Sequence, residues 1–177
     1  MHRLFVAIRP PADIRSRLLG LMQGVKGARW QDDEQLHITL RFIGEVDGRQ
    51  AEDAAAVLDS VRASPVSVAV AGVGSFGSRG RTNAIWAGVR PHEPLAHLHR
   101  KIDQALVRTG LEPERRAYLP HITLARFGRE SGGVEAFLAD HAGLASPPFE
   151  IAAFGLYESH LGHEGASYAL VQRYLLS

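Results

Sequence analysis

Two nearly identical stretches of sequence decide the fold: Leu36-His-Ile-Thr-Leu-Arg-Phe-Ile-Gly44 and Pro120-His-Ile-Thr-Leu-Ala-Arg-Phe-Gly128. Their histidines, His37 and His121, lie 84 positions apart, close to half of a chain of 177 residues. The flanking sequence repeats as well, because an apolar run that ends in Arg-Pro occurs at 6–10 and again at 87–91. Self-similarity at such a period indicates an internal duplication.

Each half of the chain shows the same order of predicted elements: strand, helix, strand with His-Ile-Thr-Leu, helix, strand, strand. Hydrophobic periodicity and turn residues predict helices near 11–24, 50–62, 93–108 and 132–142. Strands are predicted at 3–9, 36–43, 66–73, 82–89, 121–127, 149–158 and 166–174. In the third helix, an apolar stripe at helical spacing is typical of a face buried in the core, with the members Leu95, Leu98, Ile102 and Leu106.

This order predicts an α+β fold that is internally duplicated and bilobal, with two mainly antiparallel sheets flanked by helices around a central cleft. We expect residues 1–177 to form one domain, whose two pseudo-symmetric lobes cover approximately 1–85 and 86–177. A pseudo-twofold axis between the lobes would bring His37 and His121 to the same cleft.

Composition excludes several classes of protein. With 45% apolar and 22% charged residues and a formal net charge of +1, the chain is neither a disordered tail nor a general polyanion binder. The absence of cysteine excludes thiol nucleophiles, iron–sulfur clusters, cysteine-ligated zinc and disulfides. We find no signal peptide and no apolar run of about 20 residues, so we expect a soluble, cytoplasmic protein.

The duplicated His-x-Thr pattern indicates acid–base chemistry. Residues i and i+2 of a strand share a face, so His37 lies beside Thr39 and His121 beside Thr123. Of two facing imidazoles, one can accept a proton while the other donates one near neutral pH. Threonine hydroxyls can bind the non-bridging oxygens of a phosphate, and an in-line displacement at phosphorus needs a proton carrier on each side.

A metal site is the competing use of histidine. The pair His160 and His163 has a spacing that two ligands could use, but it lies in a predicted hairpin loop next to Gly162 and Gly165. The usual zinc spacings are otherwise missing. We therefore expect no metal and no cofactor.

The paired motifs resemble those of the two-histidine (2H) phosphoesterase superfamily, and most closely those of the RNA 2′,3′-cyclic phosphodiesterases, also called 2′-5′ RNA ligases or LigT-like proteins. Other similar segments are the strand 3–8, Trp30, the Gly-Ser-Phe of 74–76, the strand 85–89 and the closing hairpin of 156–170. The resemblance implies metal-independent hydrolysis of a terminal RNA 2′,3′-cyclic phosphate to a 2′-phosphomonoester, and the reverse 2′-5′ ligation. The implied partner is RNA with such an end; we expect no membrane, no obligate protein partner and a monomer.

Roles for individual residues follow from the resemblance. His37 and His121 become the catalytic pair, with His37 as the acid and His121 as the base that activates water. Thr39 and Thr123 bind the phosphate. Phe42 lines the nucleoside site, and Arg126 assists at the phosphate or ribose.

Strict strand alternation conflicts with two of these roles, because it puts Phe42 and Arg126 on the face opposite the histidines. A bulge before Gly44 and Gly128 would restore them to the cleft. Without it, Arg41 is the cleft residue that alternation favours.

Three alternatives remain open at this point. In the glycine-rich loop of 72–81, Arg79 and Arg81 either contact RNA phosphates or lie in a solvated loop. The substrate could instead be a small nucleotide, such as a cyclic phosphate of ADP-ribose. The chain could also be a non-catalytic RNA-binding module.

Overall fold

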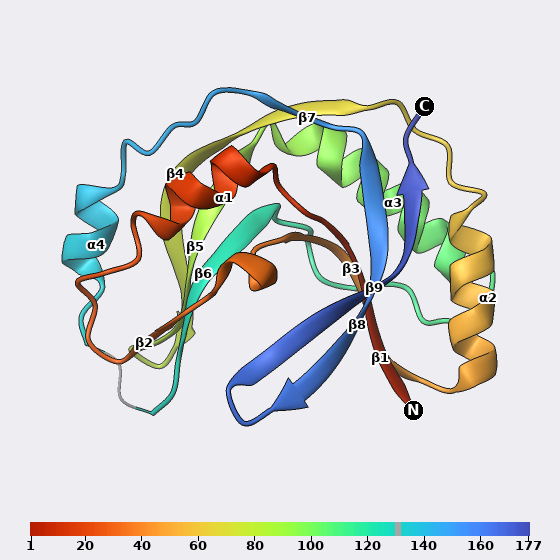
Figure 1. Ribbon diagram of the computed structural model, residues 1–177, viewed down its shortest axis with the longest axis horizontal. Helices are drawn as coiled ribbons and strands as arrows, with labels where there is room; N and C mark the ends of the chain where they lie inside the picture. The colour runs from red at the N-terminus through yellow and green to blue at the C-terminus, as the bar shows by residue number, and fades with distance from the viewer. Residues whose placement is uncertain (130–131) are drawn as a thin grey trace.

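The computed structural model describes residues 1–129 and 132–177, which form one curled, mostly antiparallel sheet with helices around it (Figure 1). The helices are α1 (Ala12–Leu19), α2 (Gly48–Leu58), α3 (His92–Val107), α4 (Glu135–Asp140) and the short 3₁₀ helix η1 (Asp33–Gln35). The strands are β1 (His2–Ile8), β2 (Ala28–Trp30), β3 (Ile38–Val46), β4 (Val66–Ser78), β5 (Arg81–Arg90), β6 (His121–Phe127), β7 (Phe149–Ile151), β8 (Ala153–Gly162) and β9 (Gly165–Leu175). The predicted α+β class is confirmed.

The strand order is symmetric about the centre of the sheet. It runs β7-β4-β5-β6-β3-β1-β8-β9, with β2 paired to β6. On one side of the centre, β6 is followed by β5 and β4. On the other side, β3 is followed by β1 and β8 in the equivalent places. The single pair Ile38↔Ile122 joins β3 to β6. The two predicted sheets therefore meet at the two copies of the same motif and continue into one another.

The two sequence repeats exchange strands. β4 pairs with β5, the strand that begins the second repeat, while β8 and β9 from the end of the second repeat extend the sheet beyond β1. The spatial halves of the sheet therefore do not coincide with residues 1–85 and 86–177.

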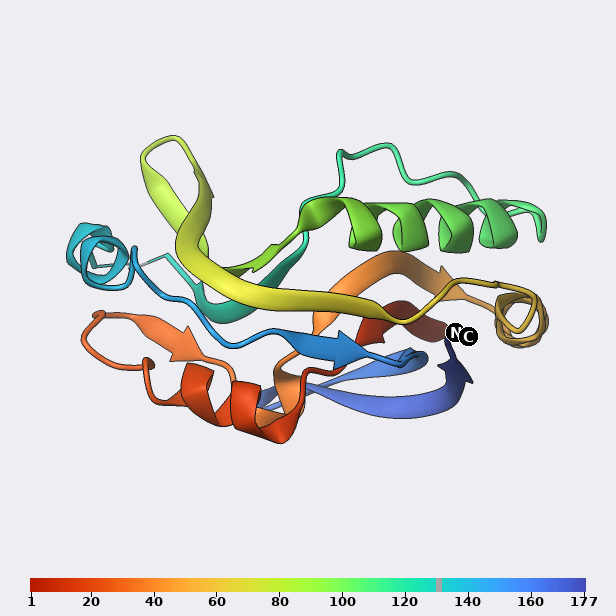
Figure 2. The same cartoon turned by 90° about the horizontal axis from the view of Figure 1, so that it is seen from above.

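The segment predicted as one strand over 149–158 is two strands. β7 pairs with β4 near one edge of the sheet, and β8 pairs with β1 toward the other, with Ala152 between them. A single extended segment cannot follow both partners because the sheet curls. The step from β7 to β8 thus connects the two sides of the curled sheet (Figure 2).

Helix packing agrees with the apolar patterns. Figure 2 shows α3 on one side of the sheet and α1 on the other, with α2 and α4 at opposite ends of the molecule. The predicted core stripe of α3 is confirmed, since Leu95, Leu98, Ile102 and Leu106 are completely buried. α1 ends at Leu19, earlier than predicted. Its apolar spacing continues to Leu21 and Met22, but Gly20, a poor helix former, caps the helix before them.

The glycine-rich segment is a β-hairpin rather than a loop. β4 continues to Ser78 and β5 begins at Arg81, so only Arg79 and Gly80 form the turn. Both have positive φ angles, 54° and 75°, as a two-residue hairpin turn of type I′ requires. At Gly74 a Cβ atom would lie 2.3 Å from the Trp86 ring, so this glycine lets the indole lie across β4.

Candidate active site

Two connected elements that sequence patterns missed, β2 and η1, prepare the first histidine. η1 is a single turn closed by a capping box in which the side chains of Asp32 and Gln35 bond each other's backbone N–H. The Gln35 carbonyl then accepts a hydrogen bond from His37 Nδ1 at 2.7 Å. The Gln35 side-chain Nε2 donates to the Ala166 carbonyl of β9 at 2.7 Å, which ties η1 to the closing hairpin.

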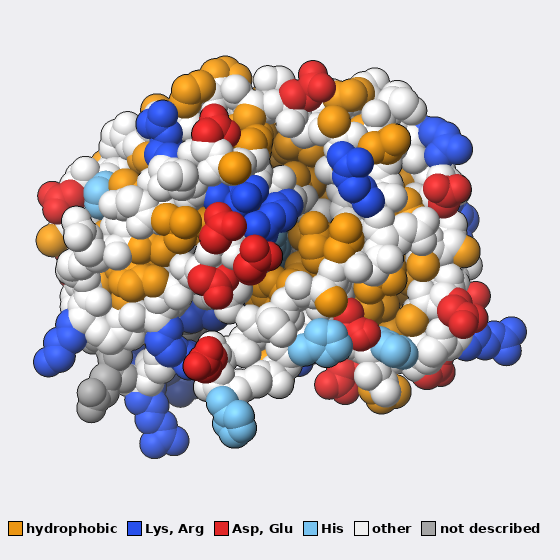
Figure 3. Space-filling model, viewed as in Figure 1, with side chains coloured by type: hydrophobic (Ala, Val, Ile, Leu, Met, Phe, Trp, Pro, Cys, Tyr) orange, Lys and Arg blue, Asp and Glu red, His pale blue; other side chains and the backbone are white. Residues whose placement is uncertain are grey.

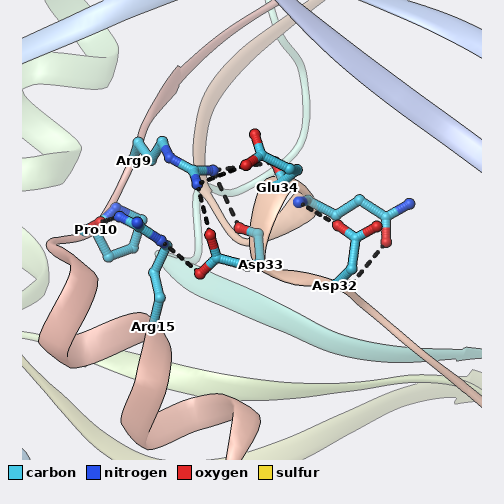
Figure 4. A network of polar contacts seen from close by, with 7 residues as sticks. Arg9, Pro10, Arg15, Asp32, Asp33 and Glu34 are labelled. Carbon is cyan, nitrogen blue, oxygen red and sulfur yellow. Dashed lines mark hydrogen bonds and ion pairs between the residues drawn. The ribbon is translucent and has the colours of Figure 1, made fainter.

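A charged network fixes η1 against the start of α1 (Figure 4). Asp33 accepts hydrogen bonds from Arg9 at 3.1 Å and from Arg15 at 2.9 Å, and Arg9 also donates to the carbonyl oxygens of Asp33 and Glu34. These arginines hold the pKa of the Asp33 carboxyl below its ordinary value. The turn that precedes His37 is thus anchored by Arg9, which directly follows β1, and from α1 and β9.

His121 is held in the equivalent way. Its Nδ1 bonds the carbonyl of Leu119, also two residues earlier, at 2.7 Å. Because a carbonyl can only accept, Nδ1 carries the proton in both histidines, and the neutral rings turn an unprotonated Nε2 away from that carbonyl. His37 Nε2 accepts from the Thr39 hydroxyl at 2.9 Å.

The register at the centre of the sheet brings the motifs together. Continuing the Ile38↔Ile122 pair by one residue sets His37 opposite Thr123 and His121 opposite Thr39. Residues opposite or diagonal on neighbouring antiparallel strands lie about 4.5–8 Å apart. The two histidines and two threonines therefore share one site.

A bulge in each motif strand decides which later residues face that site. Along β3, Ala7 pairs with Thr39 and Val6 with Arg41, so Leu40 is the extra residue. Along β6, Trp86 pairs with Thr123 and Ile85 with Ala125, so Leu124 is the extra residue. Each bulge switches the face of the positions that follow it.

Phe42 and Arg126 consequently lie on the histidine face. Phe42 pairs with Phe5, whose ring lies 5.1 Å from that of His37 and 6.1 Å from that of Phe42. Arg126 follows the bulge at Leu124 and so lies on the face of His121. Beside burial, its positive charge is one of the causes that lower the pKa of both His37 and His121. β3 has a second irregularity at Ile43, directly before Gly44, where a bulge was predicted. It is the bulge at Leu40, however, that turns Phe42 to the histidine face.

Arg41 does not lie in the cleft, contrary to the expectation from alternation. Its side chain is only 5% exposed and pairs with Asp103 of α3 at 2.7 Å. It also donates to the carbonyls of Phe42 and Glu112. The bulge turns it to the α3 side of the sheet, where it has a structural role.

Side chains from behind the sheet stabilise the bulge in β3. Tyr118 Oη donates to the Thr39 carbonyl at 2.9 Å, and His99 Nδ1 bonds the Leu40 carbonyl at 2.6 Å. The two rings stack with centroids 4.5 Å apart. In β6 the Leu124 carbonyl accepts from the Gln31 backbone N–H at 2.8 Å. Both bulged residues thus have a partner for the carbonyl that leaves the strand ladder.

Aromatic side chains flank each histidine, and sequence spacing did not identify them as site residues. The Tyr168 ring meets the His37 ring edge-on at 5.2 Å and the Phe5 ring at 5.0 Å. The Phe76 ring meets the His121 ring edge-on at 5.0 Å, with Trp86 at 6.0 Å. Only the pairing of β1, β8 and β9, and of β4, β5 and β6, brings them there.

The site favours neutral imidazoles in the free protein. Burial and, to a smaller extent, the positive charges of Arg126, His121 and Arg9 together lower the pKa of His37 to about 4, against the opposing effect of the Gln35 carbonyl. Burial and Arg126 also lower the pKa of His121. A bound phosphate anion would offset these positive charges and raise both pKa values.

The remaining candidates lie elsewhere. His160 and His163 are exposed at the tip of the β8–β9 hairpin, and His160 is 3.9 Å from Glu158. Across residues 1–129 and 132–177, no three His, Asp or Glu side chains gather so as to hold a metal ion. Over the same residues, no helix is both long and apolar enough to cross a bilayer.

A duplicated α+β sheet that presents two equivalent His-x-Thr strands to one cleft defines a two-histidine phosphoesterase. The model of the 2′-5′ RNA ligase superfamily matches residues 10–163, and the chain belongs to that family. The predicted family is therefore confirmed.

Individual proteins agree. An RNA 2′,3′-cyclic phosphodiesterase of Thermotoga maritima is 30% identical, over 96% of this chain and 92% of that protein. One of Geobacillus stearothermophilus is 33% identical over 75% of this chain, but the match spans only 43% of that protein. The apo crystal structure of Escherichia coli LigT has a TM-score of 0.79 at 25% identity, covering 99% of this chain and 98% of that one. A Thermus thermophilus crystal structure has a TM-score of 0.81 at 22% identity, covers 98% of this chain and 97% of that one, and shares the fold.

Proposed function

We propose that this protein hydrolyses the 2′,3′-cyclic phosphate at the end of an RNA to a 2′-phosphomonoester, with His37 and His121 as an acid–base pair and without a metal ion. The observation that carries the proposal is the equivalent fixation of the two imidazoles, each by an Nδ1 bond to the carbonyl two residues earlier. Membership in a family with cyclic phosphodiesterases supports the substrate.

The step balances in atoms and protons. Water attacks phosphorus in line with the bond to the ribose 3′ oxygen, and that bond breaks while the 2′ ester remains. One imidazole takes the proton of the water and the other gives a proton to the 3′ oxygen. Thr39, Thr123 and Arg126 hold the non-bridging oxygens, whose negative charge keeps the donor imidazole protonated.

We assign His121 as the base and His37 as the acid. Among the described residues no group bonds His121 Nε2, so its lone pair is open to a water molecule, whereas His37 Nε2 already bonds Thr39. A substrate with sulfur in place of the 3′ oxygen tests this order, because a thiolate leaves without being protonated. We expect His37→Ala to lose much less activity on the sulfur substrate than on the oxygen substrate, and His121→Ala to lose the same on both.

The same geometry allows ligation. If an RNA 5′-hydroxyl takes the place of water, displacement of the 3′ oxygen leaves a 2′-5′ phosphodiester. No other group has to move, so the ligase reaction is the alcoholysis that corresponds to the hydrolysis.

Incubation of the protein with an oligonucleotide that ends in a 2′,3′-cyclic phosphate, in the presence of a chelator, tests the proposal. We expect a 2′-phosphomonoester product, and a loss of about 10²–10⁴-fold in kcat for His37→Ala and for His121→Ala. His97→Ala, an exposed histidine on α3, is the matched control and should keep full activity. Full activity in either of the first two variants, or loss of activity with the chelator, would refute the mechanism.

The dependence on pH separates an enzyme from a module that only binds RNA. For the acid–base pair, kcat/KM follows a bell-shaped curve, and the lowered pKa values place its limbs at or below pH 6.5. A binding module would show a change in affinity with pH and no turnover.

A further inference from the structure

Two arginines stand directly opposite each other at the rim of the cleft. β2 pairs with β6 so that Arg29 is opposite Arg126, between the pairs Ala28↔Phe127 and Trp30↔Ala125. Ala125 and Phe127 are buried in the core, and Trp30 packs on Phe137 of α4. Arg29 therefore shares the opposite, cleft-facing side of the strands with Arg126.

The wider register confirms this orientation. The positions Phe76, Ala84, Arg126 and Arg29 form one row across β4, β5, β6 and β2. Phe76 is in contact with the His121 ring, so the row lies on the histidine face. Arg29 lies one strand away from Arg126, a step of about 5 Å across the sheet.

Like charges directly opposite on antiparallel strands destabilise the pair. Within the described residues neither Arg29 nor Arg126 has a carboxylate within ion-pair distance, and both are exposed. Arg81, also exposed at the start of β5, donates to the Arg129 carbonyl at 2.9 Å and adds a further charge beside them. Basic side chains gather over β2 and the neighbouring strand ends at the lower left of Figure 3.

This arrangement suits an extended anion with more than one phosphate. Arg126 is among the charges that act on both histidines and so belongs to the reacting phosphate. Arg29 is not among those charges, which leaves it for a second phosphate. A ribose separates the cyclic phosphate at an RNA end from the next phosphodiester, on the 5′ side of the same nucleoside. Guanidinium groups are well suited to bind such phosphates.

We propose that Arg29 binds the phosphodiester on the 5′ side of the terminal nucleoside, so that the protein distinguishes an RNA end from a free cyclic mononucleotide. The inference rests on the proposed function and adds a substrate preference to it. Arg29 takes no part in the bond changes at the reacting phosphorus. It contributes to binding of the strand that carries the reactive end.

The test compares two substrates with the same terminal nucleoside, a 2′,3′-cyclic mononucleotide with a free 5′-hydroxyl and a short oligonucleotide. For Arg29→Gln we expect kcat/KM on the oligonucleotide to fall about tenfold and kcat/KM on the mononucleotide to stay unchanged. Arg29→Lys should recover most of the loss, and the slope of log kcat/KM against log salt should decrease by about 0.7 in Arg29→Gln. Arg49→Gln, an exposed arginine on α2, is the control and should change neither substrate.

An equal loss on both substrates would overturn the inference, because Arg29 would then act on the reacting phosphate or on the fold. No loss on either would overturn it as well. If the wild-type protein is inert on both substrates, the proposed function fails, and binding of an oligonucleotide with a 3′-phosphate then decides the role of Arg29. Weaker binding by Arg29→Gln than by Arg49→Gln supports the role, and equal binding refutes it.

Discussion

At the scale of single residues, the cleft is symmetric in its histidines and asymmetric in what accompanies them. Phe42 and Arg126 occupy equivalent positions, each five residues after the motif histidine and each beyond a bulge. One side of the cleft thus presents an aromatic ring and the other a guanidinium. This difference gives a direction to a site whose two imidazoles are otherwise held alike, since only one side attracts the phosphate charge.

The lowered pKa of His37 predicts how stability depends on pH. The unfolded chain takes up a proton on this histidine below about pH 6.5, whereas the folded protein does so only near pH 4. The stability is therefore complete above pH 6.5 and decreases as the pH falls toward 4, by up to about 3 kcal/mol for this residue. We expect His37→Gln to lose less stability than the wild type between pH 7 and pH 4.5, as measured by urea unfolding. An identical decrease in the two proteins would contradict the assignment, because the other titrating groups are the same in both.

At the scale of elements, sequence patterns located most strands but not their irregularities. Period-2 alternation identified His37, Thr39, His121 and Thr123 as pairs on one face. It could not show the bulges, because Leu40 and Leu124 are apolar residues of ordinary appearance. The groups that fix the first bulge, Tyr118 and His99, are about 60–80 positions away in the sequence. Arg41 was predicted on the wrong face because the bulge at Leu40 was not predicted. The hairpin at Arg79-Gly80 was not predicted because glycine-rich sequence is typical of loops.

The bulge in β3 should depend on Tyr118. Tyr118→Phe removes the hydrogen bond to the Thr39 carbonyl and leaves that part-buried oxygen without a partner, which costs about 1–3 kcal/mol in unfolding free energy. Because Thr39 and Phe42 flank the bulge, we also expect kcat/KM to fall several-fold under conditions where the variant is fully folded.

The matched control is Tyr174→Phe, which breaks a similar 2.7 Å bond to the Ala55 carbonyl away from the cleft. It should lose comparable stability and keep its activity. Equal activity of the two variants would show that the bulge holds its shape without Tyr118.

At the scale of the whole molecule, the repeat predicted the symmetry of the sheet but not the exchange of strands between the repeats. Internal sequence similarity shows which segments are equivalent. It does not show which strands pair, because that depends on which strand edges meet in the folded chain. β4 and β8 occupy equivalent places because each pairs with the first strand of the other repeat. Neither repeat therefore contains all the strand partners that its own part of the sheet needs.

This exchange predicts that the halves fold only together. A chain divided at the Arg79-Gly80 turn leaves β4 without β5 and β2 without β6 in the first fragment, and β8 without β1 in the second. Unpaired strand edges and the exposed apolar faces of β4 and β8 should keep each fragment unfolded or aggregated, with little tertiary signal in near-ultraviolet circular dichroism. When co-expressed, the fragments should associate into a native-like complex, because the missing pairings are all supplied across the cut.

The intact protein should accordingly unfold in one cooperative transition, with the same midpoint by fluorescence and by circular dichroism. A stable, monomeric fragment, or two separate unfolding transitions in the intact chain, would show that the halves are independent lobes and that the continuous sheet through Ile38 and Ile122 does not couple them.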